Sequence, residues 1–179
     1  MGESGMTSRE IEDLNYKEKL DSGQKFEEHV YKCLEEEWGF LIKGHKSQFM
    51  QFEVGENQFG MEIKYDKMSE RTSNLYIETH EKKYSTNKDW IPSGIYRSDN
   101  SWLFLNGVYE KFYIFSIKTL RELDRNLNDR YRRETPTSKG FLLRKEIAKE
   151  LAINIIDVKE EMLWKPPDVI QKQEWMDRF

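Results

Sequence analysis

The chain has little of what several common protein classes require. Cys33 is the one cysteine among 179 residues, so no disulfide can form within the chain. It stands at an apolar position of a predicted helix, which favours a buried structural thiol over a nucleophile. One cysteine and three scattered histidines do not supply the paired ligands of a zinc site. No Gly-rich turn between a strand and a helix marks a nucleotide-binding loop.

Long apolar runs are also missing. No segment approaches the roughly 20 apolar residues that cross a bilayer, and the first twenty residues lack the apolar centre of a signal peptide. Together with the single cysteine, this predicts a cytoplasmic protein with no membrane partner.

The net charge of −4 and the pI of about 5.6 argue against a nucleic-acid binder with a wholly basic surface. A local basic patch beside an acidic metal site is compatible with that balance.

Aromatic residues are well represented, with five Trp, nine Tyr and ten Phe to fill a core. The length suits one domain, which we place at residues 22–160. A polar N-terminal extension (1–21) precedes it, with a short helix expected around 11–20, and a C-terminal tail (161–179) with another short helix follows it. The first predicted elements of the domain are a helix over about 22–38 ending at Gly39, a strand within 40–54, and strands at 61–66 and 75–82. Strands at 101–106 and 111–117 follow, around a turn at Asn106-Gly107. A helix from Leu120 to about Leu127 and a last strand and helix within 141–156 complete the order. This order predicts an α/β or α+β fold with a mixed central sheet flanked by helices.

Two short segments alternate apolar and polar residues, and they carry most of the chemistry. Successive side chains of a strand point to opposite faces, so Glu62, Lys64 and Asp66 share one face of the first strand. Glu78 and His80 share a face of the second strand, together with Tyr76 and Lys82. If the two strands are adjacent, three carboxylates and a lysine meet on one patch, which is the composition of a divalent-metal site.

A simpler interpretation makes Lys64 and Glu78 ordinary cross-strand partners, worth about 0.2–1 kcal/mol. Three acids around one lysine balance poorly in charge, however, and crowded carboxylates raise one another's pKa unless a cation joins them. On the first predicted helix, Glu27 falls at the edge of the apolar stripe and could reach such a site, whereas Glu28 points to solvent.

Several segments in order resemble phage-type members of the restriction-endonuclease-like superfamily, whose signature is PD-(D/E)-X-K. The similar segments are Gly23-Gln-Lys-Phe-Glu27, Gly55-Glu-Asn, Gly60-Met-Glu-Ile-Lys-Tyr-Asp66, Asn74-Leu-Tyr-Ile-Glu78, Ser93-Gly-Ile-Tyr96-Arg-Ser-Asp, Ile117-Lys-Thr-Leu-Arg121 and Thr137-Ser-Lys-Gly-Phe-Leu142. The resemblance implies a helix followed by a three-stranded meander, with acids on its second and third strands. It also implies Mg²⁺- or Mn²⁺-dependent hydrolysis of DNA phosphodiester bonds by a phage or mobile-element protein.

The residues of this chain can be aligned with the PD-(D/E)-X-K signature in two ways. In the first, Glu62 or Asp66 is the acid of the second strand, Glu78 that of the third and Glu27 the supporting acid of the helix. His80 then occupies the lysine position, and Lys64 fills the role from the neighbouring strand. In the second, Glu62-Ile-Lys64 is itself the acid-X-lysine, with Glu53 or Glu56 as the upstream acid.

The predicted metal ligands are therefore Glu62, Asp66 and Glu78, and Lys64 or His80 would orient or deprotonate the attacking water. Predicted nucleic-acid contacts are Lys82, Lys83, Arg130, Arg132 and Arg133. RNA stays open as a substrate, and cutting both strands would favour a homodimer. The alternative is a catalytically inactive binding module for nucleic acid or protein on the same fold.

Overall fold

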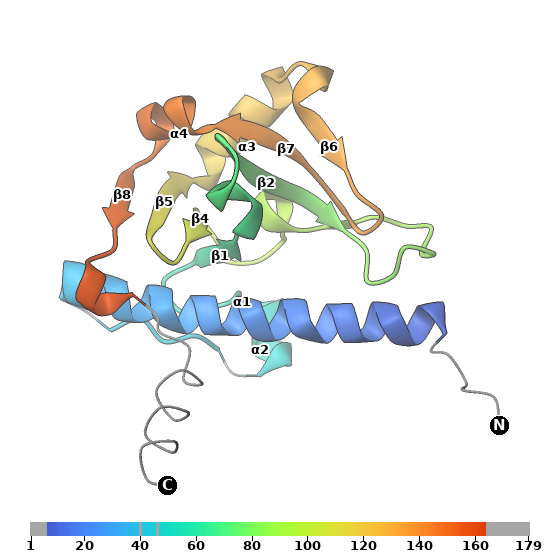
Figure 1. The fold of residues 1–179 in the computed structure, drawn as a ribbon, viewed down its shortest axis with the longest axis horizontal. Coiled ribbons are helices and arrows are strands. Elements are labelled where there is room, and N and C mark those ends of the chain that lie inside the picture. Colours follow the sequence, from blue (N-terminus) through green and yellow to red (C-terminus); the bar gives the residue numbers. More distant parts are fainter. Residues whose placement is uncertain (1–6, 40, 46, 164–179) are drawn as a thin grey trace, which may run out of the picture.

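The computed structural model describes residues 7–39, 41–45 and 47–163, and side chains within these ranges except those of residues 48, 52 and 53. Its α-helices are α1 (Ser8–Trp38), α2 (Gln48–Glu53), α3 (Ile117–Asn126) and α4 (Lys145–Leu151). Its strands are β1 (Met61–Tyr65), β2 (Asn74–Glu81), β3 (Ile91–Pro92), β4 (Leu103–Val108), β5 (Lys111–Ser116), β6 (Arg132–Glu134), β7 (Ser138–Arg144) and β8 (Asn154–Asp157). Figure 1 shows their arrangement.

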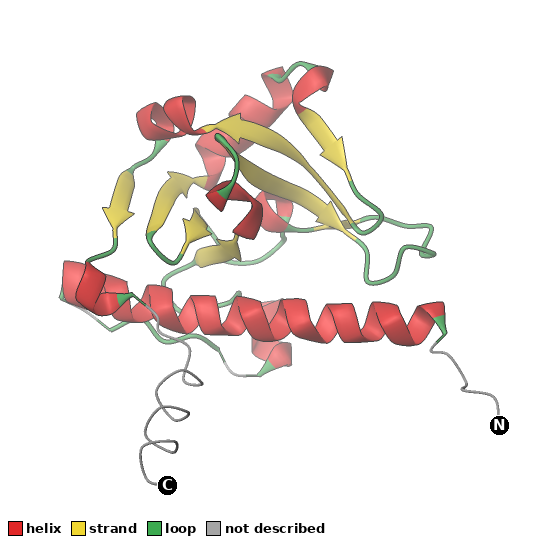
Figure 2. Ribbon diagram, viewed as in Figure 1, coloured by secondary structure: helices red, strands yellow, loops and turns green. Residues whose placement is uncertain are grey.

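The strands form two four-stranded sheets rather than the one central sheet predicted. The first has the order β1-β4-β5-β8, with β1 parallel to β4 and the other pairs antiparallel. The second has the order β3-β2-β7-β6 and is antiparallel throughout. The predicted class, a mixed α+β fold, is confirmed (Figure 2).

Strand β4 belongs to both hydrophobic cores. Leu103 and Leu105 pack in the core that includes the second half of α1, whereas Phe104 packs in the core between the two sheets. Strand β5 alternates in the same way, with Phe112 in the first core and Phe115 in the second. Since side chains of a strand point to opposite faces, the first sheet lies between α1 and the second sheet.

Helix α1 joins the two helices predicted around 11–20 and 22–38 into one continuous helix. Thr7 caps it in a capping box with Glu10, so the helix begins at Ser8 and the expected boundary at residue 22 falls inside it. The predicted end is confirmed, because Gly39 closes the helix in the left-handed region at φ 71°. Buried residues of α1 lie only in its second half, from Phe26 to Leu34.

Two other predictions are wrong. Within the described part of 40–54 there is a loop and the short helix α2 in place of a strand, with Ser47 at the position before the helix. Asn106 and Gly107 lie inside β4 and not in a turn, because the chain reverses at Tyr109-Glu110. A Cβ on Gly107 would lie 2.6 Å from the Phe112 Cα, so close strand packing requires glycine there. The tail beyond residue 163, where a short helix was predicted, lies outside the described residues.

In the ranges that the structure describes, no helix combines the length and the apolarity needed to cross a membrane.

Candidate functional site

The two charged strands do not pair with each other, contrary to the prediction. Strand β1 pairs with β4 in the first sheet, and β2 pairs with β7 in the second. The three-stranded meander implied by the resemblance is therefore absent from the described strands. The sheets nevertheless meet here, because the Asn106 amide on β4 donates a 3.0 Å hydrogen bond to the carbonyl of Tyr76 on β2.

Lys64 links the two sheets through its ammonium group. Its Nζ lies 3.0 Å from Glu62 Oε1 on its own strand and 3.3 Å from Glu78 Oε1 on β2. Burial alone would lower the pKa of Lys64, but the charges of Glu78 and Glu62 outweigh burial and raise this pKa well above its usual value. Lys64 is therefore held as a cation between two carboxylates.

Glu78 is held from both sides by hydroxyl groups. Ser93 donates to its Oε1 at 2.8 Å, and Ser138 of β7 donates to its Oε2 at 2.9 Å. Burial would raise the pKa of Glu78, yet the Lys64 charge and these hydrogen bonds lower it. Gly94 passes so close that a Cβ there would lie 2.3 Å from the Glu78 carbonyl oxygen. Its φ of 51° also suits glycine, so the turn Gly94–Tyr96 rests directly on β2.

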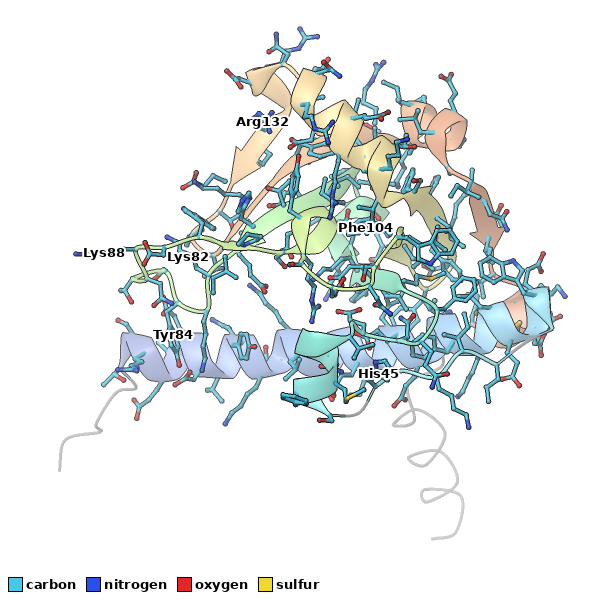
Figure 3. The ribbon with its side chains drawn as sticks, turned by 180° about the vertical axis from the view of Figure 1, so that it is seen from behind. His45, Lys82, Tyr84, Lys88, Phe104 and Arg132 are labelled. Atoms are coloured by element: carbon cyan, nitrogen blue, oxygen red, sulfur yellow. The ribbon has the colours of Figure 1, made fainter. Side chains whose placement is uncertain are left out.

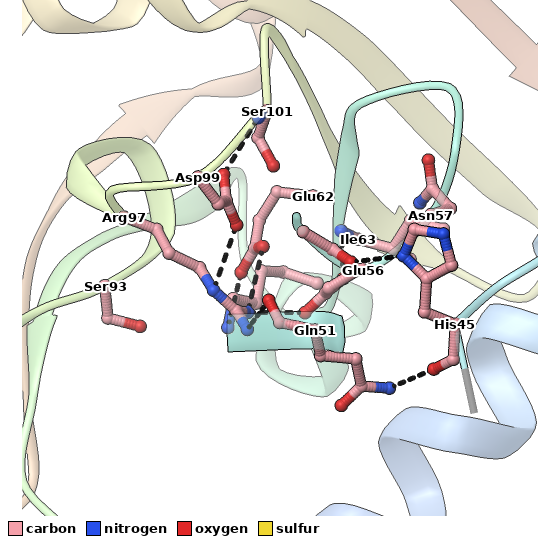
Figure 4. A network of polar contacts seen from close by, with 12 residues as sticks. His45, Gln51, Glu56, Asn57, Glu62, Ile63, Ser93, Arg97, Asp99 and Ser101 are labelled. Carbon is pink, nitrogen blue, oxygen red and sulfur yellow. Dashed lines mark hydrogen bonds and ion pairs between the residues drawn. The ribbon is translucent and has the colours of Figure 1, made fainter. Parts of the chain in front are cut away.

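Arg97 is the second cation of the site, and it lies between three acids (Figure 4). Its Nη1 lies 2.9 Å from Glu56 Oε1 and 3.2 Å from Glu62 Oε2. Its Nε lies 3.1 Å from Asp99 Oδ2, and its Nη2 donates to the Gln51 carbonyl at 3.3 Å. Burial opposes the charge of Arg97, but Glu62 and Glu56 raise its pKa. Glu62, which is 0% exposed, thus contacts both cations.

Two carboxyls outside β1 interact electrostatically with Glu62: that of Glu27 on α1 and that of Glu56 in the segment before β1. Burial, with the negative charge of Glu62, raises the pKa of Glu27 on α1 to about 7. The same two causes raise the pKa of Glu56 well above its usual value, and Glu56 Oε2 also accepts from the Ile63 amide at 3.2 Å. Glu27 is partly buried and Glu28 exposed, as the helical spacing predicted.

We call these residues the carboxylate cluster: Glu27, Glu56, Glu62 and Glu78, with Lys64 and Arg97 between them. The cluster contains Glu62, Lys64 and Glu56 of the second alignment, and also Glu27 and Glu78 of the first. The side chain of Glu53, the other upstream acid, lies outside the described part. Arg97 and Ser93 are site residues for which the sequence predicts no role, because both lie in irregular segments with no periodic signal.

Two predicted site residues do not join the cluster. Strand β1 ends at Tyr65, and Asp66 instead accepts hydrogen bonds from the backbone amides of Ser69 (3.2 Å) and Tyr76 (2.6 Å). Asp66 thus caps the short helix Lys67–Glu70 and ties it to β2. The strand pairing shifts between Glu78 and His80, and the His80 ring contacts the hydroxyl of Thr79 and the ring of Tyr96.

The predicted nucleic-acid contacts divide into two groups. The arginines are engaged within their own segment: Arg132 pairs with Asp124 at 2.6 Å, Arg133 donates to the Arg130 carbonyl, and Arg130 lies over the Tyr131 ring. The lysines lie on aromatic rings near the end of β2. Lys82 Nζ lies over Trp90, and Lys83 Nζ lies over Tyr16 and Tyr84.

The donor chemistry of the cluster fits a hard divalent cation. Its potential ligands are carboxylate oxygens. Burial, and then the charge of Glu62, raises the pKa values of Glu27 and Glu56, and a bound cation would oppose both effects. Within 7–39, 41–45 and 47–163, however, no three acidic, His or Cys side chains lie close enough together to hold a metal ion. Lys64 and Arg97 lie between the carboxylates, so a metal would have to displace at least one of these contacts.

No protein-family model, curated protein or solved structure matches this chain.

Proposed function

We propose that the protein is a divalent-metal-dependent endonuclease that hydrolyses DNA phosphodiester bonds at the carboxylate cluster. The observation that supports this best is the partly buried contact of Lys64 with both Glu62 and Glu78 where the two sheets meet. Glu62 with Glu27 or Glu78 would hold Mg²⁺ or Mn²⁺. The metal, when bound, would lower the pKa of a water molecule and neutralise charge on the phosphate.

Lys64 and Glu27 differ in protonation at neutral pH, so we give them different roles in the proposed reaction. Because its pKa is raised, Lys64 keeps its proton at neutral pH and cannot act as the base. It would instead orient the attacking water and offset the negative charge that develops on the phosphate. If Glu62 and Glu78 are the metal ligands, Glu27 is not bound to the metal. Its pKa of about 7 then makes it the better candidate for the group that accepts a proton.

A second candidate is a nucleic-acid-binding module without catalysis. The specific observation in its favour is that Lys64 and Arg97 already neutralise Glu62 from both sides. His80, which occupies the lysine position of the first alignment, contacts Thr79 and Tyr96. In this module the cluster would serve only to join the two sheets.

Cleavage of plasmid, linear duplex, single-stranded and branched DNA in Mg²⁺ or Mn²⁺ separates the two candidates. The wild type is compared with an EDTA sample and with Glu78→Gln, which keeps the shape of the side chain but removes its charge. Glu150→Gln on α4 is the matched control, because Glu150 is exposed and lies outside the cluster. The endonuclease predicts cleavage that EDTA and Glu78→Gln abolish and Glu150→Gln retains. Failure to cut any of these substrates, with no metal-dependent rise in the melting temperature, would leave the binding module.

A further inference from the structure

The Trp90 ring, just before β3, contacts the ammonium groups of two lysines, one directly after β2 and the other on β7. Lys82 Nζ lies 4.2 Å and Lys139 Nζ lies 4.4 Å from the centroid of its ring. Lys82 directly follows β2, and Lys139 lies on β7. The indole face attracts cations, so one ring gathers two like charges that would otherwise repel each other. We call Lys82, Trp90 and Lys139 the lysine–tryptophan group.

Among the described residues, one ion pair is formed with this group. Lys139 pairs with Glu134 at 3.2 Å, and the Glu134 side chain is 61% exposed. An exposed pair of this kind is weak and easily exchanged for another anion. The three side chains of the group are half-buried, so the two lysine ammonium groups are held near the surface. This arrangement suits an external anion with charges at two neighbouring positions.

The loop that follows β2 is fixed before any ligand binds. The Tyr84 hydroxyl donates to Asp13 of α1 at 3.0 Å, and Ser85 donates to Glu12. Lys83 lies over Tyr16 and Tyr84, so its charge is directed to α1 and not to Trp90. Figure 3 shows Tyr84 directed to α1, with Lys82 and Lys88 at the same end of the molecule. Lys88 is exposed in this loop and adds positive charge.

The lysine–tryptophan group is continuous with the carboxylate cluster along both strands. Ser138, the neighbour of Lys139, donates to Glu78. Thr79, next to Glu78, donates to the Lys139 carbonyl at 3.1 Å, and the Lys82 amide donates to the Thr137 carbonyl at 2.8 Å. A chain of negative charges bound at the group would therefore lie close to Glu78.

We propose that the lysine–tryptophan group binds two neighbouring phosphates of a DNA strand and leads that strand to the carboxylate cluster. A lysine ammonium is a compact point charge, so the contact is to the backbone and independent of base sequence. The second part, delivery to the cluster, rests on the proposed endonuclease function. The first part, phosphate binding, does not.

The test is binding of fluorescently labelled DNA by anisotropy in EDTA, where cleavage plays no part, over a series of salt concentrations. The Lys82→Ala/Lys139→Ala variant should bind duplex DNA at least tenfold more weakly, and its plot of log affinity against log salt should be flatter by about 1.8, the release of two counterions. Trp90→Leu should weaken binding, whereas Trp90→Phe should restore most of it. Lys118→Ala/Lys149→Ala removes two exposed lysines elsewhere and should change neither affinity nor slope.

The proposal would be overturned if the Lys82→Ala/Lys139→Ala variant kept the wild-type slope of log affinity against log salt, or if Trp90→Leu bound DNA as tightly as the wild type. Tighter binding of RNA than of DNA of the same sequence would also overturn it. Circular dichroism and melting in EDTA show that each variant is folded. If the double variant loses binding while the wild type cuts no DNA, the binding surface stands and the endonuclease fails. If the wild type cuts DNA and the double variant binds and cuts equally well, the endonuclease stands and the surface fails.

Discussion

The charge on Glu27 links the stability of the fold to pH. The folded-state pKa of about 7 lies above the ordinary value of 4.5 because burial and Glu62 disfavour the ionised form. Between these two values the unfolded chain has lost the proton while the folded chain retains it. The free energy of unfolding therefore falls as pH rises through this window, and the penalty is complete above pH 7.

Glu27→Gln should remove this penalty, because the amide stays neutral at every pH. Relative to the wild type, the variant should gain about 2–3 kcal/mol in free energy of unfolding between pH 5 and pH 8. Urea denaturation across this range measures the gain, and Glu28→Gln on the exposed side of α1 should show none. A wild type and a Glu27→Gln variant with parallel pH profiles would contradict the interpretation.

Arg97 is the second cation that offsets the negative charge of the carboxylate cluster. Arg97→Gln leaves Glu56, Glu62 and Asp99 without their shared cation, which should cost about 3–5 kcal/mol at pH 8. If a metal binds at the cluster, Mn²⁺ should then raise the melting temperature more in Arg97→Gln than in the wild type. Arg97→Lys keeps the charge and is the control. An equal rise in both proteins would show that Arg97 does not compete with the metal. Melting at pH 5 reports whether the variant folds.

At the scale of elements, the sequence patterns identify strands better than they identify partners. Alternation over 61–66 and 75–82 predicts two strands with Glu62, Lys64 and Glu78 on their charged faces, and β1 and β2 confirm both strands. The pattern says which face is charged and not which strand lies alongside, so the pairing of β1 with β4 was missed. Asp66 continued the alternation, but the strand ends one residue earlier.

The remaining differences between the predicted and the observed structure lie in segments without a clear periodic pattern. Arg97 and Ser93 lie in irregular segments, where no period marks the direction of a side chain. Helix α2 is six residues long, too short for helical spacing to show. The first half of α1 has no buried apolar stripe, so the sequence indicates only a short separate helix there. The capping box at Thr7 and Glu10 is the signal that marks the true start.

Strand β4 should be the most sensitive element, because it contributes to both cores. Phe104→Ala should lower the free energy of unfolding by about 3–5 kcal/mol, since Phe104 is 0% exposed between the sheets. Ile153→Ala, at a side chain that is 60% exposed, should change it by less than about 0.5 kcal/mol. Chemical denaturation of both variants makes the comparison, and similar losses would show that the core between the sheets adds little.

At the scale of the whole molecule, the two sheets are joined by the apolar core around Phe104 and by the Lys64 ammonium. Strands β4 and β5, which pack in both cores, and a partly buried ion pair between the sheets favour unfolding of the two sheets in one transition. The ion pair is the part of this junction that can be measured by itself, because the chain offers a matched pair at the surface. Lys111 and Asp157 lie 2.6 Å apart, with the Asp157 side chain 74% exposed.

A double-mutant cycle of Lys64→Met and Glu78→Gln should give a coupling energy of about 1–3 kcal/mol. Each single change leaves a buried charge with fewer partners, and Lys64→Met alone should cost about 3–5 kcal/mol because Glu62 also loses a cation. The cycle of Lys111→Met and Asp157→Asn should give no more than about 1 kcal/mol, since water screens that pair. Urea denaturation at pH 7 measures both cycles. Equal coupling in the two would mean that Lys64 does not hold the sheets together, and that its place among the carboxylates serves only the chemistry proposed for the cluster.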